Sequence, residues 1–260
     1  MNTSIALEID SRGVARVTLN RPDMHNAFDD HMIKELTDCF AALGDNARVR
    51  LVILTGAGKS FSAGADLNWM KRAAAQGEEA NRADAERLAV MLQILNGCPK
   101  PVVGLINGPA YGGGVGLAAC CDIAVAASTA VFGLTEVRLG IIPAAISPFV
   151  LAKIGQSAAR RWMLTGARFG ADEALRIGLV HQVVDDLNRA AEVLIADILA
   201  SGPQAIGDMK ALVSEVAGRT IDTQLLTLVA HRIAVRRASD EGKEGIAAFI
   251  EKRKPAWYGQ

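Results

Sequence analysis

Apolar and polar residues alternate along the first twenty positions of the chain, and this pattern predicts two β-strands. The segments 5–10 and 14–20 flank Ser11-Arg12-Gly13, which is short, polar and ends in glycine. Alternation of this kind gives each strand one face toward a core and one toward solvent. Two such strands around a tight turn predict an antiparallel hairpin.

A helical period replaces the alternation after Asp29. The apolar residues Ile33, Leu36, Phe40 and Leu43 recur at spacings of three and four. Residues at these spacings share one face of a helix, so a helix with a buried face is predicted up to about residue 43. The Asp29 carboxylate can accept hydrogen bonds from free N–H groups in the first turn, which predicts Asp29 as the N-cap.

Short apolar runs and helical patterns then follow each other to about residue 150. Strands are predicted over 48–55, 101–106 and 123–128, and helices over 82–95 and from 112–114 to about 120. This order of elements is typical of an α/β fold. Beyond residue 151 the pattern is mostly helical, with one short strand expected within 179–184 and helices expected from Pro203, Ile221 and Ser239.

Composition excludes several classes of function. The chain has 260 residues, with 28 Lys and Arg balanced by 28 Asp and Glu. A formal net charge of zero provides no global field toward nucleic acid or a membrane surface, so an anionic ligand must meet a local cationic cluster. The uncharged run 101–121 contains six glycines and two prolines, which argue against a membrane-spanning helix.

The cysteines predict neither zinc binding nor disulfides. Cys39, Cys98, Cys120 and Cys121 lack a C-x-x-C pair, and no signal peptide precedes them. Reduced, buried thiols in a cytoplasmic protein are therefore expected, with no bound metal.

Two glycine-rich sequences are similar to nucleotide-binding motifs but do not complete them. The segment 55–60 ends like a phosphate-binding loop, yet Ile53 stands where that motif needs its first glycine. The spacing of Gly114, Gly116 and Ala119 matches a dinucleotide fingerprint, but the next predicted strand carries no acidic residue at its end. Neither match carries a prediction.

Two further loops, 61–67 and 107–114, are rich in glycine and alanine, and each follows a predicted strand. Small residues allow a ligand to approach the backbone closely. The second loop also opens a helix, whose first N–H groups are unpaired and favour negative charge. Two N–H groups that converge on one oxygen would form an oxyanion hole, although two ordinary tight turns would give the same sequence.

Glu136 is the only acidic residue between Asp122 and Asp172. A half-buried carboxylate has a raised pKa, which suits proton transfer to carbon or from water. An ion pair with Arg138 is the structural alternative.

These motifs together resemble the enoyl-CoA hydratase/isomerase family, also called the crotonase family. The similarity extends over nearly the whole chain, in the segments 19–27 (LNRPDMHNA), 61–67 (FSAGADL), 107–122, 132–143 and 249–254 (FIEKRK). The resemblance implies an α/β fold, a crotonase-like spiral of ββα units with a helical C-terminal trimerisation region. Residues 1–200 would form the spiral core with the active site, and residues 201–260 the C-terminal helical region.

The resemblance also implies roles for individual residues. The N–H groups of Ala65 and Gly113 would form the oxyanion hole, and Glu136 would be a catalytic acid/base. The path of coenzyme A would be lined by Ala63, Asp66, Leu67 and Asn68. Phe249 and Lys252 would help to hold the coenzyme A of a neighbouring subunit; their spacing of three predicts that they share one helix face. Lys252, Arg253 and Lys254 form the local cationic cluster that a phosphate-bearing ligand needs, although a solvated basic tail is the alternative.

The sequence departs from the family pattern at two places. Hydratases of this family commonly carry a second glutamate where this chain has Gly116, and a Pro-Gly-Ala-Gly-Gly turn where it has 143–148 (PAAISP). These variants look like the branch that contains methylglutaconyl-CoA hydratases of leucine breakdown and isohexenylglutaconyl-CoA hydratases of terpenoid breakdown. Such substrates carry their own carboxylate, so the loss of an enzyme carboxylate would reduce like-charge repulsion.

The sequence therefore predicts a hydro-lyase that adds water to a 2-enoyl-CoA thioester. A Δ3-Δ2-enoyl-CoA isomerase that uses a single glutamate and a non-catalytic acyl-CoA-binding or RNA-binding family member are the alternatives. No cofactor is implied beyond the coenzyme A that arrives with the substrate. The expected partners are an acyl-CoA and further copies of the chain, as a homotrimer or homohexamer, with neither nucleic acid nor membrane.

Overall fold

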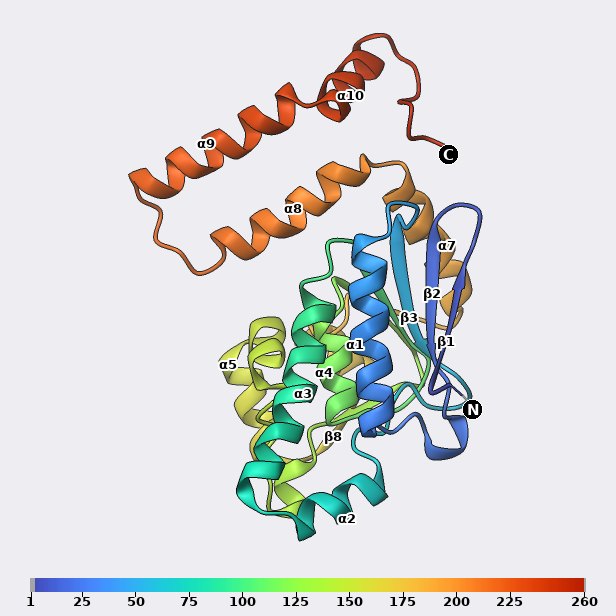
Figure 1. Ribbon diagram of the computed structural model, residues 1–260, viewed down its shortest axis with the longest axis vertical. Helices are drawn as coiled ribbons and strands as arrows, with labels where there is room; N and C mark the ends of the chain where they lie inside the picture. Colours follow the sequence, from blue (N-terminus) through green and yellow to red (C-terminus); the bar gives the residue numbers. More distant parts are fainter. Residues whose placement is uncertain (1–2, 260) are drawn as a thin grey trace.

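The computed structural model describes residues 3–259, and its centre is a six-stranded sheet with the order β1-β2-β3-β4-β6-β9 (Figure 1). The strands are β1 (Ile5–Ile9), β2 (Val14–Leu19), β3 (Leu51–Gly56), β4 (Val102–Ile106), β6 (Ile123–Ala127) and β9 (Gln182–Val184). β1 and β2 form the predicted antiparallel hairpin, with Ile5 opposite Leu19, and the remaining pairs are parallel. The α/β class predicted from the sequence is confirmed.

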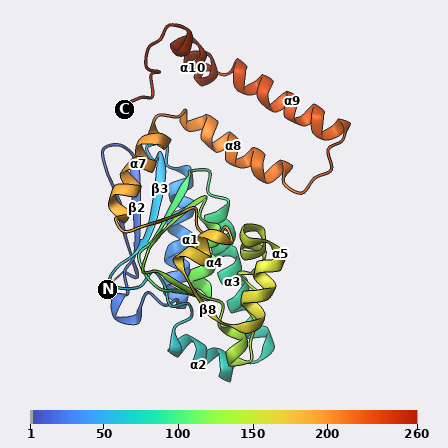
Figure 2. The same ribbon diagram turned by 180° about the vertical axis from the view of Figure 1, so that it is seen from behind.

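Helices cover both faces of this sheet, and the side-chain alternation of β3 shows how. Val52 and Leu54 belong to the larger core cluster, whereas Leu51 and Ile53 pack on the other face. The larger cluster includes residues of α1 (Asp30–Asp45), α3 (Glu78–Asn96), α4 (Gly113–Cys120) and α5 (Ser147–Thr165). On the other face, Ala191 and Ile195 of α7 (Leu187–Leu199) complete the smaller cluster (Figure 2).

Local sequence explains where several helices begin. Asp29 caps α1 as predicted, because its carboxylate accepts a hydrogen bond from the Met32 N–H at 2.8 Å. Asp66 does the same for α2 (Leu67–Ala75), a helix that the sequence analysis did not predict. α5 contains a kink at Gly155, whose φ of 70° lies in the left-handed region that glycine tolerates.

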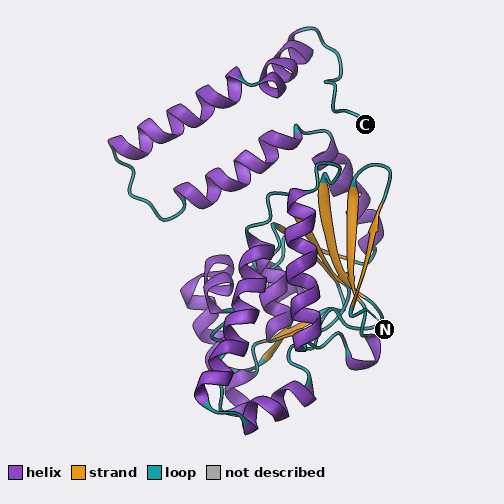
Figure 3. Ribbon diagram, in the orientation of Figure 1, coloured by secondary structure: helices purple, strands orange, loops and turns teal. Residues whose placement is uncertain are grey.

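A second sheet of very short strands lies below the main sheet and was not predicted either (Figure 3). It consists of β5 (Ala110–Tyr111), β7 (Val131–Gly133) and β8 (Arg168–Gly170), followed by α6 (Ala171–Arg176). Strands of two and three residues carry no readable alternation, so their pairing depends on tertiary contacts.

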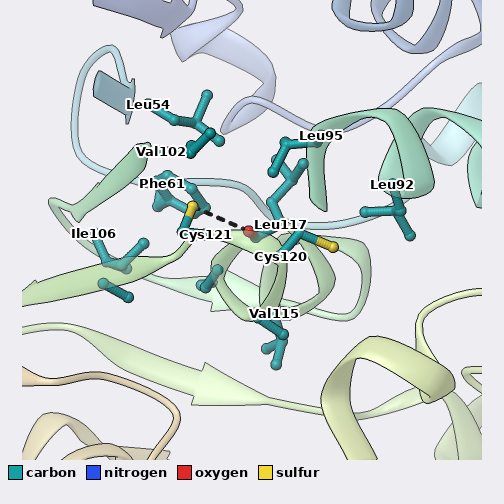
Figure 4. Close-up of a cluster of buried hydrophobic side chains, with 14 of the residues drawn as sticks. Leu54, Phe61, Leu92, Leu95, Val102, Ile106, Val115, Leu117, Cys120 and Cys121 are labelled. Atoms are coloured by element: carbon teal, nitrogen blue, oxygen red, sulfur yellow. Dashed lines mark hydrogen bonds between the residues drawn. The ribbon is translucent and has the colours of Figure 1, made fainter. Parts of the chain in front are cut away.

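The core around α4 contains two of the cysteines (Figure 4). Cys120 and Cys121 are buried beside Leu117 and Ile106, and the Cys121 thiol donates to the Leu117 carbonyl at 3.3 Å. All four cysteines are free thiols. Burial raises the pKa of Cys39 to about 11 and that of Cys121 to about 12.

The last part of the chain is helical, as predicted, with α8 (Pro203–Val216), α9 (Thr223–Ala238) and α10 (Asp240–Ile250). These helices lie at one end of the molecule, and α2 lies at the other (Figure 1). No helix between residues 3 and 259 is long and apolar enough to cross a bilayer.

Candidate functional site

Backbone contacts join the two glycine- and alanine-rich loops. The N–H groups of Phe61 and Ser62 both donate to the Pro109 carbonyl, at 3.1 and 3.2 Å, and the Tyr111 N–H donates to the Ser62 carbonyl at 2.9 Å. Gly114 allows this approach, because a Cβ there would lie 2.4 Å from the Ser62 carbonyl oxygen. The structure therefore brings together segments that lie about fifty residues apart in the sequence.

The N–H of Ala65 has no acceptor within the described part of the chain. Ala65 forms a parallel bridge with Phe28 in which Phe28 makes both hydrogen bonds. The Phe28 N–H donates to Gly64 at 2.6 Å, and the Phe28 carbonyl accepts from Asp66 at 2.8 Å. In such a bridge the N–H of the central residue points away from its partner strand. The Ala65 N–H is therefore left for another acceptor.

The N–H of Gly113 is also unpaired among residues 3–259, because Gly113 is the first residue of α4 and Gly112 provides no side-chain cap. It lies close to the first loop, since a Cβ on Gly64 would come within 3.6 Å of the Gly113 nitrogen. Phe28 packs against the same point, with its Cε2 2.5 Å from the position of a Cβ on Gly113. Phe28 thus contacts both segments that carry the predicted hydrogen-bond donors.

Glu136 lies at the same end of α4. It opens a short 3-10 helix after β7, and β7 is held to the second loop by the Gly112 N–H, which donates to the Gly133 carbonyl at 2.9 Å. The Glu136 Oε1 lies 2.8 Å from the position of a Cβ on Gly112, and the φ of 50° at Gly112 also favours glycine. The three predicted catalytic residues therefore come from two loops and a 3-10 helix that meet at one place.

The Glu136 carboxyl is partly buried. Its Oε2 is buried and has no hydrogen-bond partner in residues 3–259. Burial raises the pKa of Glu136, as predicted, and no described cation lowers it. Arg138, the alternative ion-pair partner, lies against Gly166 instead, with its Nε 3.1 Å from the position of a Cβ there. The alternative of an ion pair between Glu136 and Arg138 is therefore not realised.

The segment from Ala63 to Asn68 contains Ala65 and reaches the surface at the start of α2. Ala63 is half-buried, whereas Leu67 and Asn68 at the start of α2 are exposed. The Asp66 side chain is committed to the fold, because its carboxylate caps α2 and pairs with Arg21 at 3.0 Å.

Asn26 is a structural residue of the site that the sequence analysis did not single out. It is fully buried, and its side chain accepts from the Arg21 N–H and donates to the carbonyls of Ala57 and Ser60 at 2.9 and 2.8 Å. Its own carbonyl accepts from the Ser62 hydroxyl. These bonds fix the beginning of the loop that carries Ala65. Its sign in the sequence was its place in the segment 19–27 (LNRPDMHNA), which carries part of the family resemblance.

One prediction about the C-terminal residues is wrong. Phe249 and Lys252 do not share a helix face, because α10 ends at Ile250 and Lys252 has a left-handed φ of 54°. Phe249 is 84% exposed, at the end of the molecule opposite α2 (Figure 1). Within one chain, neither residue reaches the segment from Ala63 to Asn68.

The basic cluster at 252–254 is also partly neutralised. Arg253 pairs with Glu244 and Glu251, both at 2.6 Å, and the Lys254 ammonium lies over the Tyr258 ring. Among the residues of this cluster, Lys252 has no such partner in the described structure and is exposed.

The two departures from the family pattern meet in space. Gly116 is buried in α4, and a Cβ there would lie 2.5 Å from Ile146 Cγ2 and 2.9 Å from Ile146 Cβ. Ile146 belongs to the variant turn at 143–148 and is itself buried. A glutamate at position 116 is therefore incompatible with Ile146 in its present place.

Comparisons with known proteins identify the family of this chain. The enoyl-CoA hydratase/isomerase family model matches residues 10–260. A crotonyl-CoA hydratase of Syntrophomonas wolfei is 36% identical over 96% of both chains. A short-chain-enoyl-CoA hydratase of Clostridium acetobutylicum is 35% identical over 96% of both chains.

Solved structures extend the agreement to the fold. An enoyl-CoA hydratase from Shewanella pealeana superimposes with a TM-score of 0.95 at 44% identity, covering 98% of this chain and 96% of that one. Agreement at this level over nearly the full length confirms the crotonase-like fold. The chain belongs to the enoyl-CoA hydratase/isomerase family.

Proposed function

We propose that this chain is a hydratase that adds water across the double bond of a 2-enoyl-CoA thioester. The observation that carries the proposal is the meeting of two unpaired N–H groups, of Ala65 and Gly113, with the buried carboxyl of Glu136 at one end of α4. The first two provide donors for an oxygen that gains charge, and the third provides a group that can exchange a proton.

The reaction follows from these roles. The thioester oxygen accepts hydrogen bonds from Ala65 and Gly113, and the Glu136 carboxylate accepts a proton from water as the water oxygen bonds to C3. The π electrons move toward the thioester oxygen and form an enolate that the two N–H groups stabilise. Glu136 then returns its proton to C2 and the carbonyl re-forms, so one molecule of water is added. A pKa raised by burial suits a carboxyl that must both take and give this proton.

In this proposal the coenzyme A part of the substrate passes Ala63, Asp66, Leu67 and Asn68. Phe249 and Lys252 would reach it from a neighbouring subunit of a homotrimer or homohexamer, and their distance from α2 within one chain supports a role between subunits. No metal or further cofactor takes part. The free thiols support a reducing, cytoplasmic location.

Methylglutaconyl-CoA is our specific candidate for the substrate. Glu136 has no carboxylate beside it at position 116, where Ile146 leaves no space. A substrate with its own carboxylate would therefore meet less repulsion than in a site with two glutamates.

The test is Glu136→Gln, assayed by loss of the enoyl-thioester absorbance with crotonyl-CoA and methylglutaconyl-CoA. Loss of an acid/base group is expected to lower kcat by about 10²- to 10⁴-fold. Glu8→Gln, an exposed change on β1, is the matched control and should leave the rate unchanged. Unchanged turnover in Glu136→Gln would reject the assigned role.

The same assay distinguishes the alternatives. A 3-enoyl-CoA that is converted to its 2-enoyl isomer faster than water is added would identify an isomerase, which needs only one carboxyl group. Tight acyl-CoA binding without turnover of any enoyl-CoA would identify a non-catalytic member of the family.

A further inference from the structure

The turn after α10 contains a lysine where the backbone conformation favours glycine. Lys252 has a φ of 54°, in the left-handed region that L side chains rarely adopt. Its N–H donates to the Phe249 carbonyl at 3.3 Å, and the next N–H, of Arg253, donates to the Ala248 carbonyl at 3.0 Å. This pair of hydrogen bonds is the Schellman motif, which ends many helices and usually has glycine at the left-handed position. A lysine there costs stability that glycine would not cost, so we expect its side chain to have another use.

Glu244 holds this turn from within α10. Its Oε1 accepts hydrogen bonds from Arg253 Nη1 at 2.6 Å and from the Ala256 N–H at 2.9 Å, and its Oε2 accepts one from Arg253 Nη2 at 2.9 Å. A bidentate pair with arginine fixes geometry better than an ordinary surface ion pair. The hydrogen bonds from Arg253 and Ala256 hold the pKa of Glu244 at about 2, so its carboxylate is charged near neutral pH. One carboxylate therefore binds the chain after Lys252 at two points.

The segment beyond the turn is fixed to the rest of the chain as well. The Trp257 indole N–H donates to the Ala200 carbonyl at 3.1 Å, in the connection between α7 and α8. Its ring packs on Gly245 of α10, where a Cβ would lie 2.9 Å from the Trp257 Cη2. Lys252 stands between these anchored points with an exposed side chain, which has no hydrogen bond or ion pair to residues 3–259.

We propose that Glu244 is a positioning residue for the binding of coenzyme A. It clamps the turn at 251–256, so that Lys252 keeps its left-handed conformation and presents its ammonium group to a phosphate of the coenzyme A in a neighbouring subunit. Lys252 makes the contact, and Glu244 acts only through the backbone that holds Lys252. This inference rests on the proposed function, which assigns Lys252 to the coenzyme A of a neighbouring subunit.

The test compares KM for crotonyl-CoA with KM for crotonyl-pantetheine, which lacks every phosphate. Glu244→Ala should raise KM for crotonyl-CoA by about 5- to 10-fold, because the ammonium group loses its fixed position, and should leave KM for crotonyl-pantetheine within about twofold. The value of kcat should stay within about twofold for both substrates, since the reacting atoms are not involved. Should Glu244→Ala disturb folding, or assembly as measured by light scattering, Glu244→Gln should give a smaller shift in the same direction.

A double-mutant cycle separates positioning from a general loss of structure. Lys252→Met should raise KM for crotonyl-CoA at least as much as Glu244→Ala, and the double variant should match Lys252→Met alone, because Glu244 acts through Lys252. The matched control is Glu215→Ala, which removes a similar exposed pair with Arg232 at 2.6 Å and should change neither KM. Additive effects of the two substitutions, or equal changes of KM for both thioesters, overturn the inference.

Lys252→Gly tests the cost of the lysine directly. Glycine suits the left-handed conformation, so Tm should rise, and KM for crotonyl-CoA should rise with it because the ammonium group is lost. A lower Tm would show that the lysine itself stabilises the turn, and it would overturn the argument that the residue is retained for binding.

Binding distinguishes failure of this inference from failure of the proposed function. Titration calorimetry with butanoyl-CoA and butanoyl-pantetheine needs no turnover, and Glu244→Ala should weaken the binding of butanoyl-CoA only. If wild type hydrates no enoyl-CoA but the variant shows this pattern, only the proposed reaction fails. If wild type hydrates crotonyl-CoA, and Lys252→Met raises its KM but Glu244→Ala does not, only the role of Glu244 fails.

Discussion

The backbone groups at the two ends of α4 differ in their hydrogen bonding. At the N-terminal end, Gly112 provides no cap, and the Gly113 N–H has no partner within residues 3–259. At the C-terminal end, the Lys153 ammonium donates to the carbonyls of Cys121 and Asp122 at 2.8 and 3.4 Å. The protein provides a hydrogen-bond donor at one end of the helix, and at the other end it leaves an N–H group without an acceptor in the described residues.

The difference shows how stability and function divide a single short helix. A buried backbone group without a partner is costly, and natural folds rarely leave one. At the C-terminal end, the Lys153 ammonium group donates two hydrogen bonds. Its burial opposes the charged form, which lowers its pKa. Unpaired donors at the other end therefore support the proposed oxyanion hole, whose acceptor would arrive with the substrate.

The largest expected effect comes from removing a donor at the N-terminal end. Replacing Ala65 by lactic acid changes its amide to an ester and deletes the N–H without adding bulk. The value of kcat should fall by about 10²- to 10³-fold, as for loss of one oxyanion-hole donor, with little change in thermal stability. The same replacement at Ala171, the first residue of α6, should leave kcat unchanged. Equal losses at both positions would contradict the comparison.

The next effect concerns Asn26, whose hydrogen bonds fix the beginning of the loop that carries Ala65. Asn26→Ala leaves buried partners of Arg21, Ala57 and Ser60 without hydrogen bonds and places alanine at a φ of 55°. We expect a loss of about 3 kcal/mol in the free energy of unfolding, measured with urea, together with a lower kcat. Asn81→Ala removes one exposed hydrogen bond and should cost less than about 1 kcal/mol. Equal stability of the two variants would show that Asn26 does not organise the loop.

Lys153→Met should have the opposite effect to the ester at Ala65: it should lower stability and leave kcat almost unchanged. Loss of a charged donor at the C-terminal end of α4 should lower the free energy of unfolding by about 1–3 kcal/mol. The value of kcat for enoyl-CoA hydration should stay within about threefold, because the unpaired donors are at the other end. Lys243→Met on exposed α10 controls for the loss of charge. A large fall in kcat without a loss of stability would refute the division between the two ends.

The smallest effect is the pH dependence that Glu136 adds to stability. Its pKa is raised above 4.5 by burial, so the folded protein holds this proton more tightly than the unfolded chain. Its contribution is therefore complete below 4.5 and is lost as the pH rises through the raised value. Relative to wild type, Glu136→Gln should gain thermal stability between about pH 4 and about pH 8. A constant difference in Tm across this range would show that the carboxyl is not buried in solution.

Much of the main sheet could be predicted because its signals are local. Alternation marked the hairpin, the spacing of Ile33 and Phe40 marked α1, and the triple glycine marked the start of α4. The short second sheet was not predicted, because two-residue strands show no period. The helix α2 was not predicted, because Asp66 was considered for its position beside Ala65 and not as a helix cap.

The candidate site divides in the same way. The residues Ala65, Gly113 and Glu136 were identified from their motifs, and the structure places them together. The contacts of Phe28 with the Ala65 segment and with Gly113 were not predictable, because the partners lie far apart in the sequence. The same is true of Ile146 and Gly116, whose steric relation appears only once α5 packs on α4. The error at Lys252 arose because helical spacing was extended two residues beyond the end of α10.

Three of the four cysteines are buried and Cys39 is partly buried, which has a practical consequence for labelling this protein. Thiol reagents attack the thiolate, and a pKa of about 11 or 12 leaves almost none of it near neutral pH. Maleimide dyes should therefore spare the native thiols and modify a cysteine introduced on an exposed helix. A fluorophore placed in this way on α10 could test the proposed contact between subunits without prior removal of the native cysteines.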